Sequence, residues 1–64
     1  MQLNRIEAIK ALIEPESINM HGLSASEIWR LSTVKLAEII NKVFEPIDLD
    51  DPYTVIDYDT KNLN

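Results

Sequence analysis

The apolar positions are densest in residues 24–44, which hold the only Trp of the chain. At about 100° per residue, one arc of a helix here collects Ile28, Trp29, Leu36, Ile39, Ile40 and Val43. Ser24 and Glu27 have the spacing of a capping box, which predicts a helix that begins at Ser24. Its place on the apolar arc predicts that Trp29 lies in the core, and the alternative is an exposed anchor for a binding partner.

Three side chains break this pattern. Leu31 and Val34 fall on the polar face, and Ser32 falls within the apolar arc. A break at Ser32 removes both faults, because Ser is a good N-cap for a second helix. We therefore favour two helices, over residues 24–31 and 33–44. One continuous helix would instead expose Leu31 and Val34 as a second apolar stripe, a contact for self-association or a partner.

The N-terminal part has the same 3.6-residue periodicity. Its apolar positions are Leu3, Ile6, Ile9, Leu12 and Ile13. Asn4 with Glu7 forms a second capping-box spacing, and Pro15 disfavours helical geometry at the residue before it. Residues 15–23 form the connection, in which Pro15 can open a short helical turn with Ile18 and Met20 as inward anchors.

After Phe44 the pattern becomes extended. Residues 53–58 are β-branched and aromatic, which predicts a strand. A lone strand leaves its backbone unsatisfied, so residues 47–49 are expected to pair with it in a short hairpin, unless another chain does so. The prediction is a mainly α fold: a small three-helix domain over residues 1–44, followed by an acidic C-terminal extended or β segment over residues 45–64.

Charge separates these two parts. The chain has 64 residues and a net charge of −5. Residues 1–44 carry five basic and five acidic side chains, whereas residues 45–64 carry six acidic side chains against Lys61. The whole imbalance lies in the second part. A chain this short, without Cys, has a modest core, and we expect a homo-oligomer to complete it.

The acidic segment also contains apolar and aromatic residues, which purely solubilising tails lack. This mixture suits docking onto a basic groove or a free sheet edge. The predicted partner-binding residues are Asp48, Asp50, Asp51, Tyr53, Ile56, Asp57, Tyr58 and Asp59.

No residue pattern points to catalysis, a cofactor or a metal. His21 is the only His and has no nucleophile at a recognisable spacing, so we interpret it as a polar residue of the connection. Asp48, Asp50 and Asp51 look like the start of a calcium loop. Tyr53 and Asp59 stand where that loop needs Gly and Glu. We expect that the chain is not an enzyme.

The predicted order of helices and hairpin resembles a winged helix. Ser32-Thr33-Val34 opening an amphipathic helix, followed by an Asp-Pro segment, resembles the recognition helix and wing of small bacterial repressors. The resemblance implies a dimeric DNA-binding transcriptional regulator that reads DNA near Arg30, Lys35 and Lys42. The pattern departs from it in two ways: no three- or four-residue turn is predicted between the second and third helices, and the wing is acidic.

The charge distribution favours a different function. We expect a small regulatory, protein-binding module of the inhibitor, antitoxin-like or nucleic-acid-mimic type, with an acidic tail for a basic protein partner. The acidity disfavours nucleic acid as a partner. A structural subunit of a larger assembly, joined through Leu31 and Val34, is a third hypothesis. The start of the chain lacks a long apolar run, so a cytoplasmic location without a membrane partner is expected.

Overall fold

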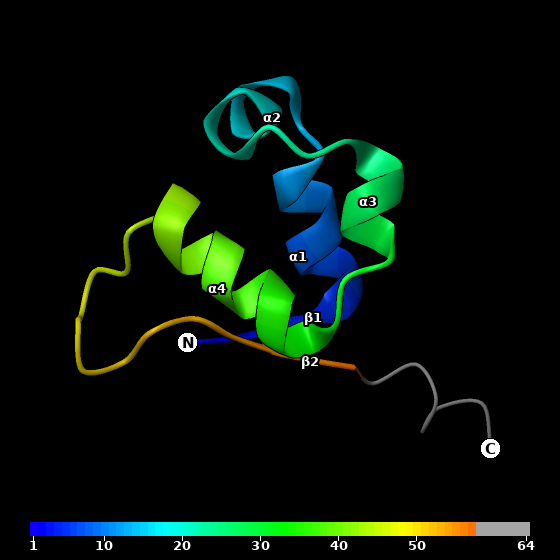
Figure 1. The fold of residues 1–64 in the computed structure, drawn as a ribbon. Coiled ribbons are helices and arrows are strands. Elements are labelled where there is room, and N and C mark those ends of the chain that lie inside the picture. Colours follow the sequence, from blue (N-terminus) through cyan, green and yellow to red (C-terminus); the bar gives the residue numbers. More distant parts are fainter. Residues whose placement is uncertain (58–64) are drawn as a thin grey trace, which may run out of the picture.

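The computed structural model describes residues 1–57 (Figure 1). In chain order its elements are β1 (Gln2–Asn4), α1 (Arg5–Leu12), α2 (Pro15–His21), α3 (Ala25–Trp29), α4 (Thr33–Val43) and β2 (Thr54–Ile56). The fold is mainly α with a C-terminal strand, as predicted. The described residues contain four helices rather than three, because part of the expected connection forms α2, and they contain a short two-stranded sheet. Among the residues described, no helix is long and apolar enough to cross a membrane.

The helix boundaries follow from local capping. Asn4 and Glu7 form a capping box at the start of α1, and Ser24 and Glu27 form one at α3, as their spacings predicted. Pro15 occupies the first turn of α2, which ends at Gly22 in the left-handed conformation (φ 74°). Leu3, expected on the first helix, lies in β1 instead.

The predicted break between the third and fourth helices is confirmed. α3 ends at Trp29, and the Ser32 side chain caps α4 by accepting a hydrogen bond from the N–H of Lys35 (3.3 Å). Residues 30–32 therefore form a three-residue connection. This corrects the expectation that no such turn precedes the candidate recognition helix.

The strand prediction was right, but its partner was not. β2 pairs in parallel with β1, in the register Gln2 with Thr54, Leu3 with Val55 and Asn4 with Ile56. No hairpin forms with residues 47–49, where Ile47 is fully exposed. The strand beside β2 comes from the other end of the chain, as Figure 1 shows.

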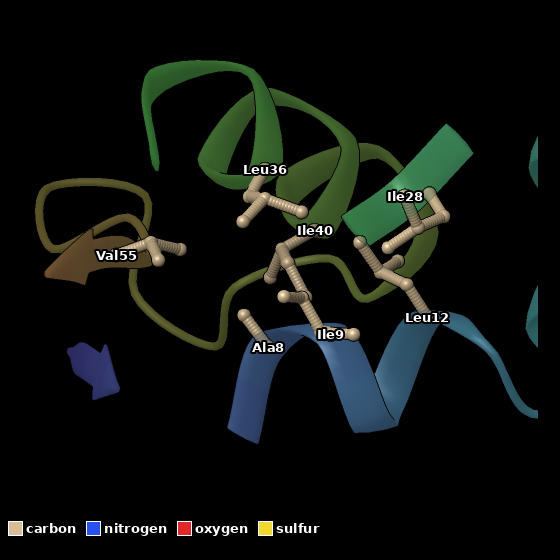
Figure 2. Packing of buried hydrophobic residues seen from close by; sticks show 7 residues of the cluster. All are labelled: Ala8, Ile9, Leu12, Ile28, Leu36, Ile40 and Val55. Carbon is tan, nitrogen blue, oxygen red and sulfur yellow. The ribbon is translucent and has the colours of Figure 1, made fainter. Parts of the chain in front are cut away.

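Within residues 1–57, the core joins four elements. Its buried apolar side chains are Ala8, Ile9, Leu12, Ile28, Leu36, Ile40 and Val55. In Figure 2 the α1 side chains point toward those of α4, with Ile28 near one end of the cluster and Val55 at the other. β2 thus packs against the helices, and the division into residues 1–44 and 45–64 stays a prediction that truncation can test.

Two side chains expected inside lie outside. Trp29 is 48% exposed and Met20 is 64% exposed. The core prediction for Trp29 was wrong because the apolar arc assumed one continuous helix from Ser24. The helical phase is reset at residues 30–32, so the buried position of α3 is Ile28 alone.

Candidate partner-binding site

We define the acidic loop as residues 45–52, between α4 and β2. It is closed by a local turn: the Asp48 carboxylate accepts a hydrogen bond from the N–H of Asp50 (2.9 Å), and the Asp48 carbonyl accepts one from the N–H of Asp51 (3.0 Å). Asp side chains favour such turns, because they bond to the backbone two residues further on. Residues 48–51 of the loop therefore form a hydrogen-bonded turn.

Two branched apolar side chains stand out from this loop. Ile47 is 102% exposed and Leu49 is 84% exposed, and they alternate with exposed Asp48 and Asp50. The sequence pattern predicts a strand for Ile47 and Leu49, and this prediction is wrong. The flanking residues Pro46 and Pro52 argue against a strand here, because proline has no N–H to donate to the hydrogen bonds of a sheet.

The third predicted carboxylate of the loop has a partner within the chain. Asp51 lies 2.7 Å from the N-terminal ammonium group of Met1, which also donates to the Pro52 carbonyl (3.1 Å). Both charged groups are largely exposed, so the ion pair adds little stability. It fixes the end of the acidic loop beside β1.

The other predicted partner-binding residues lie along and after β2. Tyr53 and Ile56 are half-buried, and Asp57 is exposed. Tyr58 and Asp59 lie outside the described residues. At about 3.3 Å per residue, the chain from Asp51 to Asp57 can span at most roughly 20 Å. The predicted set divides into a loop part before β2 and a strand part along and after it.

Asn41 on α4 holds the strand part in place. Its side-chain oxygen accepts from the N–H of Tyr53 (2.9 Å), and its amide nitrogen donates to the Tyr53 carbonyl (2.9 Å) and to the Ala37 carbonyl (2.8 Å). The helical periodicity places Asn41 on the solvent face of the helix. Its role in binding Tyr53 becomes visible only when the strand is packed against α4. An Asn side chain carries both a donor and an acceptor, so it can bond to the N–H and the C=O of one residue.

The residues predicted to mediate self-association have different environments. Leu31 is partly buried against the core, and its carbonyl accepts from the Arg5 guanidinium (2.7 Å). Val34 is 68% exposed on α4. Self-association through this pair stays a prediction.

Two charged or titratable side chains serve the fold. Arg5 also donates to the carbonyl of Trp29 (2.7 Å), so its guanidinium satisfies the C-terminal end of α3. His21 accepts a hydrogen bond from the Leu23 N–H at Nδ1 (2.9 Å), which places its proton on Nε2, directed at the Leu12 carbonyl (2.8 Å). His21 thus ties α2 to the end of α1.

The pKa of Glu27, which lies on α3 away from the acidic loop, is lowered. Hydrogen bonds from the backbone N–H and the side chain of Ser24 hold the pKa of Glu27 below its ordinary value of 4.5. Among residues 1–57, no three His, Cys, Asp or Glu side chains gather where they could hold a metal ion.

Comparison with protein-family models, curated proteins and solved structures gave no match. Function is therefore inferred from the surface of this chain alone.

Proposed function

We propose that this chain is a small protein-interaction module, of a regulatory or inhibitory kind, that presents its acidic loop to a basic protein partner. The observation that carries the proposal is the exposure of Ile47 and Leu49 on a turned loop between carboxylates. Exposed aliphatic side chains stabilise a complex only when a partner covers them.

The two kinds of side chain in the acidic loop would act at different stages of binding. Burying Ile47 and Leu49 would stabilise the complex by about 1.5–3 kcal/mol each. Asp48 and Asp50 would accelerate the encounter with a basic surface, since exposed charges act mainly through steering. Affinity should accordingly fall as salt is added, because added ions screen exposed charges.

The first test uses the full chain as bait, with the tag at the C-terminus because the Met1 ammonium group contacts Asp51. The loop variant is Ile47→Ser with Leu49→Ser, and the control is Met20→Ser, an exposed apolar residue on α2. We expect the native chain and the control to retain basic proteins, and this retention should survive nuclease treatment. The loop variant should not retain them. Equal retention by the loop variant would refute the proposal.

The second test isolates charge. Asp48→Asn with Asp50→Asn keeps the turn, because the amide side chain introduced at position 48 still offers an oxygen to the N–H of residue 50. The control, Glu14→Gln with Glu16→Gln, removes two charges near the start of α2. Only the loop pair should slow association with the captured partner.

A DNA-binding regulator is the second candidate, favoured by the three-residue connection between α3 and the capped start of α4. Few cationic side chains could contact DNA phosphates in this chain. Arg5 donates to the Leu31 carbonyl within the fold, and Lys35 lies 3.5 Å from Glu38. Binding to random duplex DNA separates the two functions. Removing the charges of Asp48 and Asp50 should strengthen DNA binding if this second function is right, because it reduces repulsion from phosphates.

A further inference from the structure

One edge of β2 is not covered by β1. The N–H of Thr54 donates to the Met1 carbonyl (2.9 Å), so Thr54 and Ile56 direct their backbone groups toward β1. Backbone groups alternate in direction along a strand. Tyr53 and Val55 therefore direct theirs toward the opposite edge.

At Tyr53 the side chain of Asn41 takes the place of a neighbouring strand. Its oxygen and nitrogen bond to the N–H and the C=O of Tyr53 (both 2.9 Å), as a residue of an antiparallel strand would do. The third bond of Asn41, to the Ala37 carbonyl, fixes the amide in that orientation. The edge is thus closed at this residue.

Two residues further along, at Val55, the edge is open. Within residues 1–57, no hydrogen bond reaches the Val55 N–H or C=O, although its side chain lies in the core. A groove of about 320 Å³ lies beside it, between α4 and β2. Its lining includes Val34, Ala37, Glu38, Asn41, Thr54 and Val55. An extended segment in this groove would satisfy the Val55 backbone and cover Val34.

The negative charge around β2 favours one kind of segment as the occupant of this groove. Residues 45–57 contain five acidic side chains and no basic one, so acids precede and follow β2. A second copy of the chain would bring the same acids to this edge and add its own charge of −5. A basic segment meets complementary charge instead. Because side chains of a strand alternate, its apolar residues would enter the groove while its Lys and Arg side chains face solvent and the carboxylates.

We propose that the edge of β2 at Val55 binds an extended segment of a basic partner protein, with alternating apolar and basic residues, as an added strand. The inference rests on the proposed function, since both require a basic partner, and it adds a second contact beyond the acidic loop.

The experiment uses the full native chain and a synthetic peptide that alternates Lys and Val. Hydrogen exchange of the Val55 amide, followed by NMR, should slow at least about tenfold when the peptide binds. A second peptide of the same sequence carries backbone N-methyl groups on every second residue, which removes the N–H groups of one edge. It should bind about tenfold more weakly. Absence of binding, equal binding of both peptides, or unchanged Val55 exchange in the complex would overturn the proposal.

A matched pair of variants tests the groove. Val34 and Met20 are similarly exposed, at 68% and 64%, so neither substitution by Arg should unfold the chain. Val34→Arg fills the groove and adds repulsion, and should weaken peptide binding more than about tenfold, whereas Met20→Arg should leave it within about twofold. Equal effects of both variants would refute the groove as the binding site.

The same measurements separate this inference from the proposed function. If Asp48→Asn with Asp50→Asn weakens peptide binding but Val55 exchange never changes, the acidic loop is the site and the added strand is refuted. If Val55 is protected and the loop variants have no effect on captured partners, the strand site stands and the loop proposal fails. A free chain that sediments as a dimer with Val55 already protected would assign the edge to a second copy and refute the basic segment.

Discussion

At the scale of single residues, position in the fold decides what a side chain does more than its chemical type. Trp29 is the largest apolar side chain, yet it is 48% exposed, whereas Ile28 beside it is fully buried. Asn41 is an ordinary helix residue by sequence, yet it makes three hydrogen bonds that connect α4 to Tyr53. Both differences lead to measurable consequences.

Trp29→Ala should lower the free energy of unfolding by roughly 1 kcal/mol, well below the ~3–5 kcal/mol of a fully buried Trp. The reason is that about half of the side chain is already in contact with water. Urea unfolding followed by circular dichroism gives the value, with Ile28→Ala as the buried reference. A variant that fails to fold would show that Trp29 is part of the core after all.

Asn41→Ala should destabilise the fold by about 1–3 kcal/mol, because the N–H and C=O of Tyr53 lose both bonds at a half-buried position. Asn19→Ala, at an exposed position of α2, is the matched control and should change little. Equal unfolding midpoints for the two variants would mean that water replaces the Asn41 amide without loss.

At the scale of elements, the sequence predicts most where both partners of an interaction lie within one turn of helix. The capping residues Asn4, Ser24 and Ser32, and the opening Pro15, were all predicted correctly. Each capping side chain accepts from an N–H two or three residues further on, and Pro15 acts through its own fixed φ angle, so spacing alone is informative.

Pairing of strands is a different problem. β1 and β2 are three residues each, and the partners Gln2 and Thr54 lie at opposite ends of the chain. Leu3 fits the helical periodicity as well as the strand, and no turn signal links such distant segments. The candidate site could be proposed only in part from the sequence for the same reason: its acids are visible in the sequence, whereas the groove and the hydrogen bonds of Asn41 require the packing of β2 on α4.

The capping box of α3 predicts a dependence on pH. The folded state lowers the pKa of Glu27, so its contribution to stability is present above the ordinary value of 4.5 and is lost as pH falls through the lowered folded value. Glu27→Gln keeps a capping side chain but does not titrate. The unfolding temperature of this variant should therefore fall less steeply in acid than that of the native chain.

Glu14→Gln is the control for that measurement, because the Glu14 side chain makes no capping hydrogen bond. Its curve should follow the native one. Parallel curves for Glu27→Gln and the native chain would show that the Glu27 carboxylate does not stabilise α3.

At the scale of the whole molecule, the two ends of the described chain support each other. β2 contributes Val55 to the core, and its neighbour β1 leads directly into α1. The sequence alone divides the chain at residue 44, where charge and periodicity change. In space, however, β2 packs against α4 and α1.

Truncation after Phe44 should therefore destabilise the helices by more than about 3 kcal/mol, since it removes Val55 from the core and the strand beside β1. That is a large part of the stability of so small a chain. The control ends at Asp57 and keeps β2. Circular dichroism and thermal unfolding of the two chains compare them directly, and equal stability would support a helical domain that ends at residue 44.

The parallel pairing of β1 with β2 also determines when each part of the chain becomes native. Helical contacts close short loops, whereas this pair closes a loop of nearly the whole chain, so it should form after the rate-limiting step of folding. Interactions that form late control how fast the native state is lost. Val55→Ala should thus accelerate unfolding with little change in the folding rate, whereas Ile40→Ala should slow folding, as stopped-flow kinetics can show. The lifetime of the folded chain is then controlled where β1 and β2 meet.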